Sequence, residues 1–303
     1  MREKYIEKNF GAAALAMLQR ITGILNDYAA QGYDLSLRQL YYQLVSRNIV
    51  ENTERSYKNV GNLVSDGRLA GLIDWNIIKD RGRETVSLPH WASPREILLS
   101  AAEQYRVDRW LNQSHYVEVM VEKQALEGVL IPVCQKWDVP FTANKGYSSS
   151  SAMHDAGRRM YEKFREDKEV TVIYLGDHDP SGIDMTRDVE ERLRLFAECC
   201  PDDTIQVEVF RVALNMDQVS TLKPPKNPAK MTDSRANDYV RKFGRSSWEL
   251  DAIEPKALAN LVSRAIESRI DKVAWEKSGA EQNQGRAFIE KVAGQPTRPR
   301  KAS

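Results

Sequence analysis

Three acidic residues stand at positions where the chain could hold a metal ion. Glu122 follows the apolar stretch 116–121, and Asp177 and Asp179 follow the apolar stretch 170–175. Such stretches are typical of buried parallel strands, whose carboxyl ends meet at one edge of a sheet. Carboxylates that converge there repel one another unless a cation lies between them, and oxygen ligands suit Mg²⁺. We therefore interpret the segment Asp-x-Asp-Pro-x-Gly as part of a magnesium site rather than a solvated turn.

A pair of tyrosines beside an arginine is the second candidate for chemistry. Arg38 precedes Tyr41 and Tyr42 in a stretch with helical periodicity. Tyr41 falls on the apolar stripe of this helix, which is typical of a core or rim side chain, whereas Tyr42 lies beside the stripe, one turn from Arg38. A nearby guanidinium favours the phenolate and can hold a phosphate, so Tyr42 could act as a nucleophile. Tyrosines beside arginines are also common on helix surfaces, so the pair alone decides nothing.

The residues around the tyrosine pair indicate a winged helix-turn-helix. Ser36 can cap the helix that contains Tyr42, a second helix follows over residues 54–69, and residues 74–88 have the pattern of two short strands about a charged turn. Residues 36–83 carry eight basic and five acidic side chains, an excess that alone does not distinguish a DNA-binding face from a solvated helix.

Basic and polar side chains in this region and beyond it suit contact with a phosphate backbone. Lys145 precedes a run of serines where a helix should begin, and free backbone amides there could hold a phosphate; an ordinary polar loop fits equally well. The candidates for contact with DNA are Arg55, Lys58, Asn62, Lys145, Arg81 and Arg83.

From residue 116 onward, short apolar strands alternate with helices, which indicates a parallel sheet flanked by helices. The strands are predicted near residues 116–121, 139–143, 170–175 and 204–212. A length of 303 residues suggests two domains. We place them at residues 1–112 and 113–285, followed by a basic disordered tail at residues 286–303.

The composition is that of a globular protein in a reducing compartment. With 42% hydrophobic and 29% charged residues, the chain has no apolar stretch that approaches a membrane helix and no apolar export signal, so we expect a cytoplasmic or nuclear protein. Its three cysteines form no Cys-x-x-Cys pair, which argues against a disulfide framework and a cysteine zinc site. The net charge of +1 argues against a non-specific polycation, although a local basic patch can still bind nucleic acid.

Together these blocks resemble the A subunit of type IIB DNA topoisomerases (topoisomerase VI) and the related meiotic double-strand-break transesterase, and most closely the free-standing members called Mini-A. The blocks cover most of residues 34–265 and occur in the family's order. They are Arg38-x-x-Tyr41-Tyr42, Val121-Glu122-Lys123-x-Ala125, Lys145-Gly146-Tyr147, Asp177-x-Asp179-Pro180-x-Gly182, and the segment from Leu222-x-Pro224-Pro225 to Trp248-Glu249-Leu250-Asp251-Ala252.

The resemblance implies an α/β protein with an N-terminal winged helix-turn-helix domain and a Toprim domain that carries a C-terminal extension. It implies a homodimer that cleaves double-stranded DNA, with the tyrosine of one subunit meeting the metal site of the other. Tyr42 would become linked to the 5′ end, with Tyr41 as the fallback, and Arg38 would stabilise the transferred phosphate. Glu122, Asp177 and Asp179 would bind Mg²⁺, and Glu122 would also exchange a proton with the 3′-oxygen.

Two other functions remain open from the residues alone. A Toprim nuclease that cuts with water would need the carboxylates but no tyrosine nucleophile. In a non-catalytic DNA-binding or regulatory protein, Mg²⁺ would only hold the fold together. The chain carries no Walker motif, so ATP-driven strand passage would require a separate B-type ATPase subunit.

Overall fold

The computed structural model describes residues 4–33, 35–78, 88–144, 146–197 and 206–294. Among these residues lies a four-stranded parallel sheet with the strand order β2-β1-β3-β4. Its strands are β1 (His115–Val121), β2 (Phe141–Ala143), β3 (Glu169–Leu175) and β4 (Val207–Ala213). The central strands β1 and β3 are buried on both faces, which explains why their sequences are almost continuously apolar. The predicted α/β class is confirmed.

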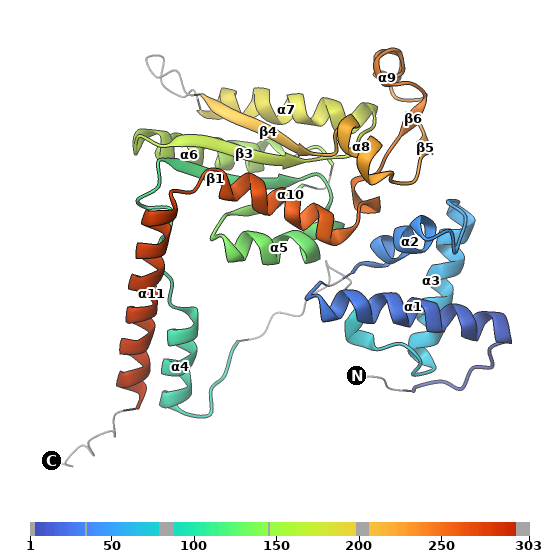
Figure 1. Ribbon diagram of the computed structural model, residues 1–303, viewed down its shortest axis with the longest axis horizontal. Helices are drawn as coiled ribbons and strands as arrows, with labels where there is room; N and C mark the ends of the chain where they lie inside the picture. The colour runs from blue at the N-terminus through green and yellow to red at the C-terminus, as the bar shows by residue number, and fades with distance from the viewer. Residues whose placement is uncertain (1–3, 34, 79–87, 145, 198–205, 295–303) are drawn as a thin grey trace.

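Helices cover both faces of this sheet (Figure 1). One face is covered by α5 (Glu127–Lys136), which follows the short turn η2 (Gln124–Leu126), and by α10 (Pro255–Glu267); the other is covered by α6 (Ser150–Arg165) and α7 (Pro180–Ala197). Successive side chains of a strand point to opposite faces, so Val119 of β1 packs in one core and Met120 in the other. No helix among the described residues is long and apolar enough to cross a membrane.

The N-terminal part has an apolar core of its own. It contains α1 (Ala12–Ala30), α2 (Leu37–Ser46), α3 (Glu54–Leu69) and the short turn η1 (Trp75–Ile77). Ile21, Leu40 and Leu44 are completely buried between these helices. Ser36 forms the predicted capping box, because its hydroxyl accepts a hydrogen bond from the Gln39 amide and the Gln39 side chain accepts one from the Ser36 amide. Most of the predicted basic hairpin lies outside the described residues, so the winged helix stays a prediction.

The chain beyond β4 returns over the carboxyl edge of the sheet. This extension contains α8 (Met216–Leu222), β5 (Asn227–Pro228), α9 (Ala236–Phe243), β6 (Ser246–Ser247) and the turn η3 (Leu250–Ala252). Leu250 packs into a core of the sheet, and Ala252 packs into the core of the N-terminal helices. The turn η3 therefore joins the two parts of the molecule and lies against α2.

The helices α4 (Pro94–Gln104) and α11 (Lys272–Ala293) lie side by side and project from the sheet as an arm (Figure 1). At the root of the arm, the Tyr105 ring lies so close to Gly285 that a Cβ at residue 285 would have no room. The guanidinium of Arg109 also lies 3.6 Å above the Trp275 ring. Helix α11 continues to Ala293, past residue 286 at which the predicted tail begins.

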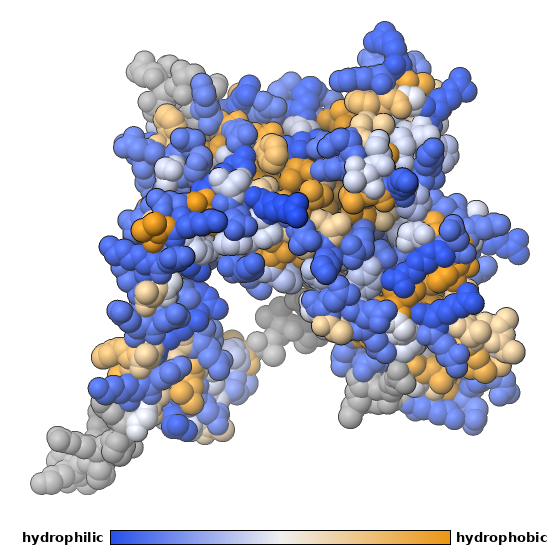
Figure 2. Space-filling model, in the orientation of Figure 1, coloured by the Kyte–Doolittle hydropathy of each residue, from blue (hydrophilic) through white to orange (hydrophobic). Residues whose placement is uncertain are grey.

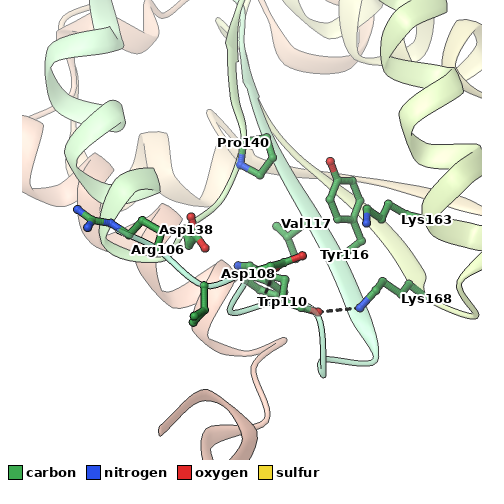
Figure 3. Close-up of a pocket in the computed structure, with 10 residues that line it drawn as sticks. Arg106, Asp108, Trp110, Tyr116, Val117, Asp138, Pro140, Lys163 and Lys168 are labelled. Carbon is green, nitrogen blue, oxygen red and sulfur yellow. Dashed lines mark hydrogen bonds between the residues drawn. The ribbon is translucent and has the colours of Figure 1, made fainter. Parts of the chain in front are cut away.

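A cavity of about 350 Å³ lies at the opposite edge of the sheet from the carboxyl ends of the strands (Figure 3). Lys168 lines it, and its ammonium group donates hydrogen bonds to the carbonyl oxygens of Trp110 (2.7 Å), Leu111 (3.0 Å) and Gln113 (2.9 Å). All three N–H groups of this buried lysine are therefore used to hold the loop before β1.

The Lys168→Met protein is expected to lose about 2–4 kcal/mol of unfolding free energy, because three carbonyl oxygens lose their donor. Chemical denaturation measures this loss. Lys163→Met is the matched control, since the Lys163 ammonium pairs with Glu166 near the surface and its loss is expected to cost less than about 1 kcal/mol. Equal stability of the two variants would show that water molecules donate hydrogen bonds to these carbonyl oxygens when the lysine is absent.

Candidate functional site

Three carboxylates among the described residues come together beyond the carboxyl end of β3. Asp177 follows that strand closely, Glu249 lies just before η3, and Asp251 lies within it. One oxygen atom of each lies within 4.8 Å of the others. We refer to Asp177, Glu249 and Asp251 as the acidic triad. Because every donor is a carboxylate oxygen, the acidic triad could hold a divalent cation of the Mg²⁺ type.

The structure places the other two predicted metal ligands outside this group. Glu122 accepts a hydrogen bond from the Asp177 amide at 2.8 Å, so it lies beside the acidic triad without belonging to it. Asp179 accepts a hydrogen bond from the Gly182 amide at 2.6 Å and caps the first turn of α7. Proline is common at the first position of a helix, and an aspartate before it can cap that helix. The Asp-x-Asp-Pro-x-Gly motif therefore also forms the start of α7.

Glu249 and Asp251 had no predicted role as ligands. The signal that could have found them is a pair of carboxylates, two positions apart, in an otherwise apolar segment (Trp248, Leu250, Ala252). Such a segment is buried, and a buried carboxylate needs a partner of opposite charge. Asp251 is only 1% exposed.

Two cations of the same chain balance part of this negative charge. The Lys123 ammonium lies 2.7 Å from an Asp177 oxygen and 3.2 Å from an Asp251 oxygen, and it also pairs with Glu249. Arg38 of α2 pairs with Glu249 at 3.0 Å and with Asp251 at 2.7 Å. Lys123 therefore contacts all three members of the acidic triad, and Arg38 ties α2 to residues more than 200 positions away in the sequence.

Burial and these ion pairs determine protonation at the site. Burial raises the pKa of Glu122 and of Asp177, and the charge of Lys123 opposes both shifts. Burial also disfavours the charged form of Glu249, but the charge and hydrogen bond of Lys123, together with Arg38, lower the pKa of Glu249 to about 2. In return, the carboxylates outweigh burial and raise the pKa of Lys123 and of Arg38. Glu249, Lys123 and Arg38 are thus ionised at neutral pH.

The residues present fit a divalent cation. Glu122 and the acidic triad offer four carboxylates, whereas Lys123 and Arg38 supply two cations. One Asp251 oxygen is buried and accepts no aligned hydrogen bond from the described residues, although it faces Arg38. Lys123 contacts the other Asp251 oxygen, so a cation in the acidic triad would replace the Lys123 ammonium at that atom.

The two tyrosines of α2 have different surroundings. The Tyr41 hydroxyl lies 3.0 Å from the carbonyl oxygen of Thr53 and 3.2 Å from that of Glu51, so it holds the segment before α3. The Tyr42 ring lies near the Arg38 guanidinium, 5.7 Å from ring centre to cation. Both tyrosines line a cavity of about 290 Å³ between α2, α3 and the extension. Tyr41 thus has a structural contact that Tyr42 does not share.

The charges around Tyr42 disfavour its ionisation. Burial, followed by the charges of Glu249 and Asp251, raises the pKa of Tyr42 to about 12, although Arg38 and Lys123 oppose the shift. The phenol is therefore protonated at neutral pH. A cation held by the acidic triad would offset the two carboxylates and make the phenolate easier to form.

Some of the residues predicted to contact DNA lie among the described residues, and others do not. Arg55, Lys58 and Asn62 are exposed on the helix α3, whose first residues line the cavity beside Tyr42. Lys58 pairs with Glu54 at 2.8 Å, which is a weak surface ion pair that a phosphate could replace. The other predicted contacts, Lys145, Arg81 and Arg83, lie outside the described residues.

His178 holds the extension against the sheet. Its Nδ1 lies 2.8 Å from the Tyr239 hydroxyl, its ring packs against Trp248, and its backbone exchanges two hydrogen bonds with the backbone of Trp248. Burial, together with the charge of Arg211, lowers the pKa of His178 to about 4, so the ring is neutral. His178 thus fixes the residue next to Glu249 and helps to position half of the acidic triad.

The His178→Ala protein is expected to lose about 2–4 kcal/mol of unfolding free energy and to bind Mg²⁺ more weakly, because the substitution leaves a cavity and releases the segment before Glu249. Denaturation measures the first effect and isothermal titration with Mg²⁺ the second. His154 is exposed, so His154→Ala should change neither quantity. Unchanged Mg²⁺ affinity in His178→Ala would show that other contacts hold the extension.

No protein-family model matches the chain, and no curated protein matches its sequence. The acidic triad and the surroundings of Tyr42 are therefore the basis for inferring the function.

Proposed function

We propose that this protein is a Mg²⁺-dependent transesterase that cleaves double-stranded DNA through Tyr42. The observation that supports the proposal is the position of α2, which brings Tyr42 and Arg38 against the acidic triad. A phenol, a guanidinium and carboxylates able to hold a cation are the groups that transfer of a DNA phosphate to a tyrosine requires. The same residues carry the resemblance to the topoisomerase VI A subunit.

In this reaction the Tyr42 oxygen forms a bond to a backbone phosphorus while the bond from phosphorus to the 3′-oxygen breaks. The phenol loses its proton and the 3′-oxygen gains one, which gives a 5′-phosphotyrosyl end and a 3′-hydroxyl. Glu122, whose pKa burial raises, is the group that exchanges a proton near the acidic triad. Arg38 holds the transferred phosphate. A cation bound by Asp177, Glu249 and Asp251 would stabilise negative charge on the phosphate oxygens.

The decisive experiment is incubation with 3′-end-labelled duplex DNA and Mg²⁺, followed by a detergent quench. We expect labelled DNA that stays attached to the protein until a protease is added, and a free 3′-hydroxyl at the cut. Cuts that carry a free 5′-phosphate, or no cuts, would contradict the proposal.

The proposal includes a homodimer, because two copies of Tyr42 are needed to cut both strands. The resemblance implies that Tyr42 acts at the partner's metal site, whereas here Tyr42 lies beside the acidic triad of its own chain. Mixed dimers of Tyr42→Phe and Asp177→Ala subunits separate the two arrangements. If Tyr42 acts at the partner's metal site, the mixed dimer keeps one complete site and cuts one strand only. If Tyr42 acts at the metal site of its own chain, neither site is complete and the mixed dimer cuts no DNA. A B-type ATPase would be a further partner for strand passage.

A metal-dependent nuclease that uses water is the second candidate. The raised pKa of Tyr42 and its exposure of only 5% favour this reaction, since a protonated, buried phenol is a poor nucleophile. Such an enzyme would leave free 5′-phosphates, would still cut as Tyr42→Phe, and would be inactive as Asp177→Ala. A non-catalytic DNA-binding protein would give no cuts, and loss of Arg55 or Lys58 would weaken its binding in a salt-dependent way.

A further inference from the structure

The cavity beside Tyr42 is lined by a cluster of aromatic rings. Its volume is about 290 Å³, and Tyr41, Tyr42 and Tyr57 all line it. The centre of the Tyr41 ring lies 5.4 Å from that of Tyr42 and 5.3 Å from that of Tyr57, so the three rings are in contact through Tyr41. We refer to this cavity as the tyrosine pocket. Its size is at the lower limit of small-molecule sites, which begin at roughly 300 Å³.

Neutral hydrogen-bonding groups complete the lining of the tyrosine pocket. The side-chain amide of Asn52, just before α3, donates a hydrogen bond to the side-chain oxygen of Asn227 in β5 at 2.6 Å. Neither the Nδ2 group of Asn227 nor the hydroxyl of Tyr57 bonds to another described residue, so both are available to a ligand. At the right of Figure 2, where the extension meets the N-terminal helices, hydrophilic and hydrophobic residues are likewise interspersed.

Two charged residues also line the tyrosine pocket, Arg38 and Glu54. Glu54 pairs with Lys58 at 2.8 Å, whereas Arg38 lies against the acidic triad. A cation able to hold a phosphate therefore adjoins the same cavity as the aromatic rings and the amides. A nucleotide has this combination of groups, because its charged phosphate is joined to a flat, uncharged base that stacks on aromatic rings and forms hydrogen bonds through its edges.

We infer that the tyrosine pocket receives one unpaired base of the DNA substrate, the base of the nucleotide whose 5′-phosphate Tyr42 attacks. This inference rests on the proposed function, which places that phosphate at Arg38. A base within a duplex is stacked and paired, so it must leave the helix to enter a cavity, and leaving costs least where the base has no pairing partner. The protein is therefore expected to select DNA that has an unpaired base at the cut.

The test compares two duplexes of the same sequence, one with a single bulged nucleotide and one with an abasic bulge at the same place. They share the distortion of the backbone and differ only in the base. Fluorescence anisotropy measures their binding in Mg²⁺ to the Tyr42→Phe protein, which cannot form a tyrosyl link. We expect the bulged base to strengthen binding about 5- to 150-fold, the effect of stacking one base on an aromatic side chain.

Two further substitutions, each added to Tyr42→Phe, show whether the base lies in the tyrosine pocket. Tyr57→Leu and the milder Asn227→Ala are each expected to remove most of the preference for the bulged base, and circular dichroism verifies that both variants are folded. Asn237→Ala is the matched control, since Asn237 is exposed on α9 of the same extension and should leave the preference unchanged. Equal affinity for the two duplexes would overturn the inference, and so would a preference that both pocket variants retain.

The position of the cut separates this inference from the proposed function. Wild type should cut at the phosphate on the 5′ side of the bulged base and remain attached to that end. A preference for the bulged base without any tyrosyl link would contradict the proposed function only. Tyrosyl links at fully paired positions, without a preference for the bulged base, would contradict only the inference about the tyrosine pocket.

Discussion

The Tyr42→Phe protein is expected to form no covalent complex with DNA, a loss of at least about a thousandfold relative to wild type. The substitution removes the single oxygen that would bond to phosphorus and keeps the ring that lies near Arg38. The detergent-quenched cleavage assay measures the loss directly. Binding of Mg²⁺ and of DNA should be unchanged, because Tyr42 is no ligand of the acidic triad.

Tyr41→Phe is the matched control for this result. It deletes the hydroxyl that contacts the carbonyl oxygens before α3, so it should lower the unfolding free energy by about 1 kcal/mol and retain covalent attachment. If Tyr41→Phe abolishes attachment while Tyr42→Phe keeps it, the two roles are reversed. If both variants cut DNA and leave free 5′-phosphates, water is the nucleophile.

Lys123→Met is expected to lower the unfolding free energy by about 3–5 kcal/mol when divalent cations are chelated. The substitution leaves Asp177, Glu249 and Asp251 without the ammonium group that contacts all three, and an unbalanced buried charge is strongly destabilising. Added Mg²⁺ should restore much of this stability and should stabilise the variant more than wild type, because the cation no longer competes with Lys123. Denaturation with chelator and with Mg²⁺ measures both effects.

The control for this prediction is Lys58→Met, which removes a lysine that pairs with Glu54 at the surface. Its unfolding free energy should change by less than about 1 kcal/mol and should respond to Mg²⁺ as wild type does. A Lys123→Met protein that is as stable as wild type in chelator would mean that the acidic triad holds protons in place of the ammonium. A loss that Mg²⁺ fails to reverse would mean that the acidic triad does not bind the cation.

The sheet could be predicted from the sequence because local composition determines it. The apolar stretches at residues 116–121 and 170–175 correspond to β1 and β3, and the strand-end positions of Glu122 and Asp177 followed from them. A pattern that lies within one strand or one helix can be recognised without knowledge of the fold. The predicted separation of Tyr41 from Tyr42 by the apolar stripe is wrong, because both side chains are buried in the core of the N-terminal helices.

The acidic triad could not be predicted in the same way, because two of its members come from a segment without regular periodicity. Glu249 and Asp251 reach Asp177 only after the extension returns over the sheet, and that path depends on contacts such as those between His178 and Trp248. The ion pairs of Arg38 with the same residues join sequence positions more than 200 apart. Local spacing can mark Glu249 and Asp251 as buried carboxylates, but it does not show which distant residues they contact.

Arg38, Lys123, Asp177 and Asp251 reach one point from widely separated parts of the chain, which also has a consequence for protein synthesis. A ribosome makes the N-terminal helices and the strands β1 and β3 well before it adds Glu249 and Asp251. Until those last carboxylates emerge, a nascent chain holds Tyr42 and Arg38 without a complete cation site. An unfinished or prematurely terminated polypeptide would therefore lack the cation site on which the proposed cleavage of DNA depends.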